Sequence, residues 1–275
     1  MATWDNLLLG LRLGERPRVL ATTTPRSVPL VRRLIDTEAN EIEITRGRTE
    51  DNRFNLSARF IRTVRSRFGR SILARQELDG ELIEDLDGAL WTRGLLEACR
   101  EASASAEPVR TVIGVDPPAS AGGDACGIVV CALGEDGIGR VLADASVAKA
   151  TPERWARAVA QAAAAWSADR VVAEGNQGGE MVRSVLHAAD CALPVRLVHA
   201  RVGKAARAEP VAALYEAGKV RHAGMFPQLE DELCGLLPGG RYEGPGRSPD
   251  RADALVWALT ELMIKRRAQP RVRLA

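Results

Sequence analysis

The feature that most restricts the fold is the order of apolar runs and amphipathic stretches in the second half of the chain. Three short apolar runs come in succession, and two more then alternate with stretches of helical periodicity. This order indicates an α/β domain with a mixed sheet and helices packed on its faces. The predicted strands are 110–116, 126–133, 139–147, 169–174 and 194–200. The predicted helices are 151–168, 178–190, 204–218 and 248–267.

Local signals place the ends of several predicted helices. Thr151 can cap the first of them, with Pro152 at the first helical position. In the same way, Ser248 and Pro249 are expected to begin the last helix. Pro210 falls inside the stretch 204–218, and we expect it to interrupt that helix.

The chain is predicted to have two parts joined by the small, polar segment 101–109. Residues 110–275 form the α/β domain, and residues 1–100 are less regular. No G-x-x-x-x-G-K-[ST] motif occurs, so a phosphate-binding loop of the usual kind is missing from this chain. The elements predicted in the first part are strands 18–25 and 40–47 and helices 29–36 and 55–69, the last with Asn55 or Ser57 near its cap.

Composition narrows the class of protein without naming a function. Hydrophobic residues make up 46% of the 275 residues, which is enough for a large core. No apolar run reaches the roughly 18 residues of a membrane span, and the net charge of +2 gives no general signal for a polyanion partner. The five cysteines include no C-x-x-C pair, so we expect reduced thiols in a cytoplasm.

Four carboxylates fall where strands end or on the last helix. Asp116 closes strand 110–116, Glu174 closes strand 169–174, and Asp250 and Asp253 share one helix face. A carboxylate at the end of a buried strand needs a positive neighbour, which could be an arginine, a helix N-terminus or a metal ion. Oxygen ligands suit Mg²⁺ or Mn²⁺, and two such ions can support phosphodiester hydrolysis. The alternative is that each acid is an ordinary turn or cap residue.

Four segments of the second half resemble, in order and spacing, the nuclease domain of the large terminase subunit of tailed bacteriophages and gene transfer agents. They are "VIGVDPPASAGGDACGIVV", "RVVAEGNQGGEMVRSVL", "VHARVGKAARAEPVAALYEAGKVRH" and "SPDRADALVWALTEL". The resemblance implies a ribonuclease H-like fold in which Asp116, Glu174 and the Asp250/Asp253 pair bind the metal. Which of Asp250 and Asp253 is the direct ligand stays open. Asp124 would be an accessory ligand, although a turn role is the simpler interpretation of that residue.

The same resemblance implies contacts with DNA phosphates from the segment around residue 204. The residues concerned are Arg201, Lys204 and Arg207. A nearly neutral chain can still carry a local basic groove. The competing interpretation is a solvated helix face.

The first part resembles the C-terminal segment of the terminase ATPase domain. In "VLATTTPR", the ATPase coupling motif would be Thr22, Thr23, Thr24 and Pro25. The phosphate-binding loop of that domain would lie upstream of Trp4. We therefore expect an incomplete P-loop ATPase segment, and no ATP hydrolysis by this chain alone.

The leading hypothesis is a Mg²⁺- or Mn²⁺-dependent endonuclease that cleaves double-stranded DNA during phage or gene-transfer-agent genome packaging. Its expected partners are the portal protein and the small terminase subunit, and its expected location is the host cytoplasm and, transiently, the procapsid portal. The alternatives are a non-catalytic assembly fragment of the packaging motor and a junction resolvase-like nuclease. The retained acids favour an enzyme, and the "TTTPR" segment favours a terminase over a resolvase.

Overall fold

A computed structural model describes residues 2–26, 28–36, 42–68, 71–101, 107–118, 125–176, 178–200 and 204–264. The chain divides into two compact units, Met1–Glu84 and Asp85–Ala275. The second unit thus begins before the predicted linker 101–109. The reason is that Trp91, Leu96 and Cys99 are buried in its core. No helix among the described residues is both long and apolar enough to cross a membrane.

The first unit consists of short helices. Its elements are α1 (Ala2–Gly10), α2 (Pro29–Asp36), the 3-10 helix η1 (Thr49–Asn55), α3 (Ala58–Phe68) and α4 (Ile72–Asp79). Helix 29–36 is confirmed, and α3 begins at Ala58, later than the predicted start at residue 55. Ser57 caps α3, since its Oγ accepts the N–H of Phe60 at 3.1 Å.

The two strands predicted in the first unit are wrong where the structure describes them. Residues 18–25 and 42–47 contain no regular element. A strand needs a neighbour to pair with its backbone groups, and no strand occurs among the described residues of this unit. The proposed coupling motif lies in this irregular segment, with Thr22 and Thr23 exposed and Thr24 and Pro25 half-buried.

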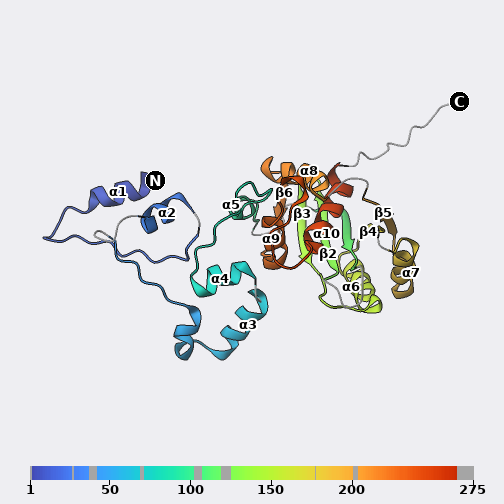
Figure 1. The fold of residues 1–275 in the computed structure, drawn as a ribbon, viewed down its shortest axis with the longest axis horizontal. Coiled ribbons are helices and arrows are strands. Elements are labelled where there is room, and N and C mark those ends of the chain that lie inside the picture. Colours follow the sequence, from blue (N-terminus) through green and yellow to red (C-terminus); the bar gives the residue numbers. More distant parts are fainter. Residues whose placement is uncertain are drawn as a thin grey trace. The chain divides into compact units, whose positions relative to one another are not determined.

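The second unit is built on a six-stranded mixed sheet (Figure 1), which confirms the mixed α/β sheet predicted for this part of the chain. Its strands are β1 (Pro108–Asp116), β2 (Gly127–Gly134), β3 (Gly139–Asp144), β4 (Arg170–Glu174), β5 (Val195–Val198) and β6 (Val220–His222). They lie in the order β5-β4-β1-β2-β3-β6. β1, β2 and β3 pair antiparallel, whereas β4, β5 and β6 each join the sheet in parallel.

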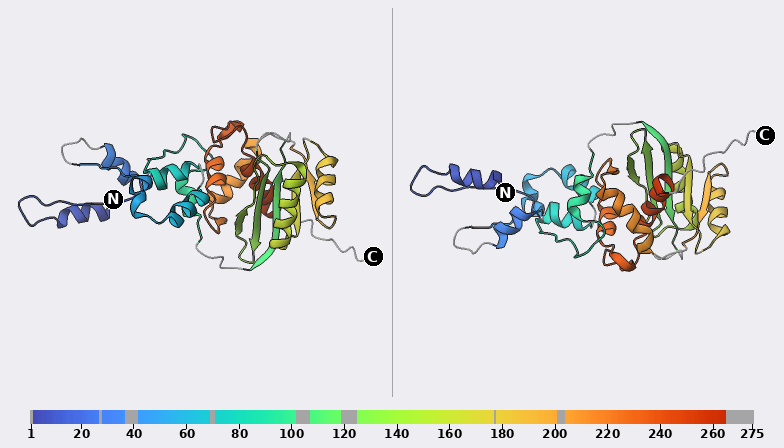
Figure 2. Two further views of the ribbon diagram at one scale, coloured as in Figure 1. Left: turned by 90° about the horizontal axis from the view of Figure 1, so that it is seen from below. Right: turned by 90° about the horizontal axis from the view of Figure 1, so that it is seen from above.

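Helices cover both faces of this sheet, as the two views of Figure 2 show. They are α5 (Arg93–Ala98), α6 (Pro152–Ala165), α7 (Glu180–Ala189), α8 (Lys204–Glu216), α9 (Pro227–Cys234) and α10 (Asp250–Leu259), with the 3-10 turn η2 (Pro238–Gly240) and a π-helical turn, Thr260–Ile264, after α10. Alternate residues of each strand face opposite cores. Ile113 and Val115 join the cluster under α6 and α7, whereas Val112 joins the cluster under α8, α9 and α10.

Two helices differ from their predicted form. α8 continues through Pro210, so the predicted interruption is wrong, although the proline removes one backbone hydrogen bond and its ring crowds the carbonyl one turn earlier. α10 begins at Asp250, so Pro249 rather than Ser248 occupies the N-cap position. The predicted end of this helix at residue 267 lies outside the described residues.

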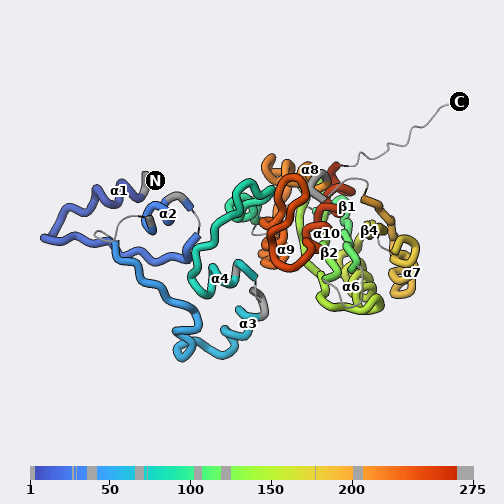
Figure 3. Tube along the Cα trace, in the orientation of Figure 1, coloured from blue at the N-terminus to red at the C-terminus, as the bar shows by residue number. Residues whose placement is uncertain are grey.

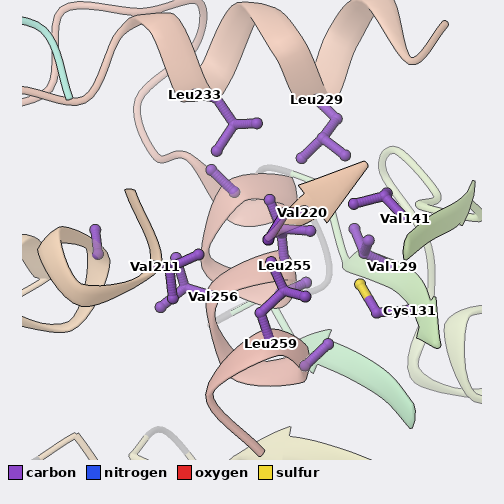
Figure 4. Packing of buried hydrophobic residues seen from close by; sticks show 14 of the residues in the cluster. Val129, Cys131, Val141, Val211, Val220, Leu229, Leu233, Leu255, Val256 and Leu259 are labelled. Atoms are coloured by element: carbon purple, nitrogen blue, oxygen red, sulfur yellow. The ribbon is translucent and has the colours of Figure 1, made fainter. Parts of the chain in front are cut away.

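α10 packs directly across β1 and β2 (Figure 3). Its apolar side chains Leu255, Val256 and Leu259 enter the core shown in Figure 4. Two glycines allow the close approach of its backbone. A Cβ at Gly114 would overlap the carbonyl of Ala254, and a Cβ at Gly127 would overlap that of Asp250. The sheet therefore fixes where α10 begins.

Candidate active site

Two of the four predicted acids end neighbouring parallel strands. Val115 of β1 pairs with Ala173 of β4, so the next residues, Asp116 and Glu174, leave the sheet at the same edge. Both side chains are half-buried. Two apolar runs that each end in an acid give this arrangement when their strands are parallel neighbours, as β1 and β4 are.

The other two acids lie in the first turn of α10. Asp116 is paired across the sheet with Gly127, and the backbone carbonyl of Asp250 packs on that glycine. Asp250 and Asp253 are buried, with 7% and 3% of their surface exposed. The topology thus brings the start of α10 to the strand edge that carries Asp116 and Glu174.

The electrostatic surroundings of Cys126 reflect the same convergence. Burial raises the pKa of its thiol well above the usual value, and the negative charges of Asp116 and Asp250 raise it further. Cys126 lies next to Gly127 and is wholly buried. The carboxylates of Asp116 and Asp250 therefore both lie near the thiol of Cys126.

Arg207 of α8 is a positive neighbour of two of the four acids, Glu174 and Asp253. Its Nη1 lies 3.4 Å from Glu174 Oε2, and its Nη2 lies 3.7 Å from Asp253 Oδ1. The guanidinium also stacks on Trp257, 4.4 Å from the ring centroid, and its side chain is only 9% exposed. Arg207 was predicted to contact DNA, but the structure places it in ion pairs with two of the acids.

Trp257 completes this group from the next turn of α10. Its indole N–H donates to Glu174 Oε2 at 2.9 Å. It follows Asp253 by four residues, which puts both on one helix face. The sequence contained that spacing, but nothing in it linked the indole to a carboxylate on β4.

The remaining predicted residues are only partly described. Asp124 and Arg201 lie outside the described residues. Lys204 is the first residue of α8, and the structure describes its backbone only. Among the residues that are described, no three acidic, histidine or cysteine side chains lie close enough together to hold a metal ion. In the described part of the chain, the cation that lies beside Glu174 and Asp253 is the guanidinium of Arg207.

The sequence pattern did not reveal a row of buried acids on α9. Glu230, Asp231 and Glu232 are 2%, 2% and 4% exposed. Each is ion-paired with a different arginine, namely Arg100, Arg93 and Arg251 respectively. Three successive acids in "QLEDELC" look like a solvated helix face, so the pairing could be found only from the tertiary structure.

A mixed sheet of this order, with acids at the ends of β1 and β4 and on a helix across them, defines the ribonuclease H-like class of nuclease folds. Residues 113–262 match the family described as the terminase RNaseH-like domain. The chain belongs to this family. No curated protein matches it.

Several solved structures are similar to this chain at low sequence identity. The large terminase of a thermophilic bacteriophage has a TM-score of 0.50 and 9% identity, over 79% of this chain and 55% of that one. The large terminase of bacteriophage HK97 has a TM-score of 0.48 and 14% identity, over 75% and 51%. The large terminase nuclease of another thermophilic phage, G20c, has a TM-score of 0.46 and 17% identity, over 63% and 98%. This chain thus spans about half the length of each of the two large terminases that it matches.

Proposed function

We propose that this chain carries the nuclease of a DNA-packaging terminase and cleaves double-stranded DNA. The observation that supports this most is the meeting of Asp116 and Glu174 at one sheet edge, with the acidic start of α10 packed across it. Family membership supports a nuclease role in packaging.

The proposed cofactor is a pair of Mg²⁺ or Mn²⁺ ions. The donor set fits such ions in its chemistry, because Asp116, Glu174, Asp250 and Asp253 offer only carboxylate oxygens. The G20c nuclease has been crystallised with bound cobalt, and that of the bacterial virus Sf6 with calcium. When bound, divalent ions supply positive charge for the scissile phosphate and lower the pKa of water.

The chain's own side chains supply the positioning. Trp257 fixes the orientation of Glu174, and Arg207 offsets the charge of Glu174 and Asp253. For the DNA backbone we propose Arg201, Lys204 and Arg207 near the start of α8, so Arg207 would change partners when substrate binds. Asp124 is proposed only as an accessory ligand.

The remaining proposals concern the whole packaging machine. The sequence predicted residues 1–100 as a terminase ATPase segment, and we propose this origin for the first compact unit, Met1–Glu84, with Thr22, Thr23, Thr24 and Pro25 as its coupling motif. The portal protein and the small terminase subunit are the proposed partners, with the procapsid portal in the host cytoplasm as the place of action. Since the sequence contains no phosphate-binding loop, we expect no ATP hydrolysis from this chain alone.

Plasmid cleavage tests the proposed function. The purified chain should nick or linearise supercoiled DNA with Mn²⁺ or Mg²⁺, and EDTA should stop the reaction. Asp116→Asn should remove the activity, whereas Glu135→Gln, a change on the exposed surface, should leave it intact. Failure of the wild-type chain to cut with either ion would favour a non-catalytic assembly role.

A further inference from the structure

The first turn of α10 is capped by a side chain from another helix. Its N-cap residue is Pro249, which makes no side-chain capping bond. The acceptor comes instead from α9, where Glu232 Oε2 accepts the backbone N–H of Arg251 at 2.7 Å and that of Ala252 at 3.1 Å. The backbone N–H groups of a first helical turn have no acceptor within their own helix, so they need one from elsewhere. A buried carboxylate on another helix therefore caps the turn that carries Asp250 and Asp253.

The same turn is held by the side chain of Arg251, which lies between these two acids in the sequence. Its Nη1 donates to Glu232 Oε1 at 2.8 Å, and its Nη2 donates to Gln228 Oε1 at 2.7 Å. Its Nε lies 3.2 Å from Asp144 Oδ2 at the end of β3. Arg251 thus joins α10 to both α9 and the sheet.

These contacts complement the glycine contact on the sheet. The carbonyl of Asp250 is packed on Gly127, which lies across from Asp116. Gly127 determines how closely the first turn of α10 approaches β2. The Glu232–Arg251 ion pair holds the same turn against α9. Movement of the turn would shift Asp250 and Asp253 relative to Asp116 and Glu174.

We propose that Glu232 and Arg251 are positioning residues that set the geometry of Asp250 and Asp253 for divalent-ion binding. This inference rests on the proposed function. Neither residue contacts the ion. They act on it through the first turn of α10, as outer groups commonly do when they orient the ligands of a metal.

α9 offers a matched control for this role. Glu230 is as deeply buried as Glu232 and lies on the same helix, but its carboxylate pairs with Arg100 and lies 3.5 Å from His222 Nδ1. It also accepts the N–H of Phe226 at 3.1 Å. Loss of Glu230 removes a comparable buried ion pair without touching α10.

The test is Mn²⁺ titration by calorimetry on the full chain, for the wild type, Glu232→Ala and Glu230→Ala. Both variants should melt at lower temperature, but only Glu232→Ala should weaken Mn²⁺ binding, by about tenfold or more. Its DNA cleavage should recover as Mn²⁺ is raised to saturation. Equal Mn²⁺ affinity in Glu232→Ala and the wild type, or equal loss in both variants, would overturn the inference.

A milder pair keeps the comparison possible if Glu232→Ala does not fold. Arg251→Lys keeps the charge but cannot reach three acceptors at once, and Arg100→Lys is its counterpart at Glu230. We expect Arg251→Lys alone to lower Mn²⁺ affinity, by roughly threefold, and equal affinities in the two variants would contradict the inference. A wild type that binds no Mn²⁺ would defeat the proposed function as well, whereas a binding wild type with unaffected variants defeats only this inference.

Discussion

Arg207 is ion-paired with Glu174, with 3.4 Å between Nη1 and Oε2, in a site where only 9% of the arginine side chain is exposed. The same guanidinium reaches Asp253 at 3.7 Å. A buried acid group is therefore compensated by an arginine, and a divalent ion would have to share these carboxylates with it.

Replacing this arginine should have opposite effects on folding and on metal binding. Arg207→Gln removes a buried positive charge from beside Glu174 and Asp253, so in EDTA the free energy of unfolding should fall by about 3 kcal/mol. Mn²⁺ should bind several times more tightly, because one competing positive charge is gone. Mn²⁺ should consequently restore the melting temperature of the variant more than it raises that of the wild type.

The control for that experiment is Arg183→Gln. Arg183 makes a surface ion pair with Glu180 on α7, 40% and 75% exposed respectively. Surface pairs contribute little, so neither stability nor Mn²⁺ affinity should change measurably. Unchanged Mn²⁺ affinity in Arg207→Gln would show that the arginine does not compete with the ion.

Gly114→Ala should displace α10 from the sheet. The added Cβ would overlap the carbonyl of Ala254, which is backbone and cannot rotate away. We expect a loss of about 3 kcal/mol in the free energy of unfolding, measured by urea denaturation. The control is Gly94→Ala in helix α5. A Cβ at Gly94 would lie 4.0 Å from Thr92 Oγ1, which is an ordinary van der Waals contact. A smaller loss in Gly114→Ala than in Gly94→Ala would contradict the close packing described.

The strand-end acids illustrate what the sequence could predict. Asp116 and Glu174 each follow an apolar run, so the sequence predicts that they meet if the two strands are neighbours, and the pairing of β1 with β4 meets that condition. The partners of Glu174 could not. Arg207 and Trp257 reach it from two helices whose positions depend on how α8 and α10 pack on the sheet, which no local pattern records.

The wrong predictions have causes that lie outside the local sequence. Residues 18–25 and 40–47 were predicted to be strands, but a strand forms only where a neighbour can pair with its backbone groups. β6 was missed because its three residues, Val220–His222, form a strand only by pairing with β3. The N-cap position of α10 is Pro249 and not Ser248 as predicted, and Glu232 of α9 accepts two backbone N–H groups of the first turn, a contact that only the tertiary structure reveals.

Glu230 should give the fold a defined sensitivity to acid. Burial raises the pKa of its carboxyl, but His222 and Arg100 outweigh this effect and lower the pKa from 4.5 to about 2. A depressed pKa adds stability above the unfolded value, and this stability is lost as pH falls from 4.5 towards 2. The difference in unfolding free energy between wild type and Glu230→Gln should be largest above about pH 5 and shrink towards pH 2. A difference independent of pH would contradict this assignment.

Lys204→Ala should separate DNA binding from chemistry. Removing one phosphate contact should weaken DNA binding and reduce the slope of log affinity against log salt by about one. The single-turnover cleavage rate at saturating DNA should stay close to that of the wild type. A slope equal to that of the wild type would remove Lys204 from the DNA interface.

The most direct test of the proposed nuclease is single-turnover cleavage by Glu174→Gln with Mn²⁺ at saturating DNA. The predicted result is a rate lower by on the order of 10²-fold or more, roughly 3 kcal/mol of transition-state stabilisation. Glu180→Gln, a little further along the chain and exposed on α7, should cleave like the wild type. If Glu174→Gln cuts as fast as the wild type, the acids at this sheet edge are not the catalytic site.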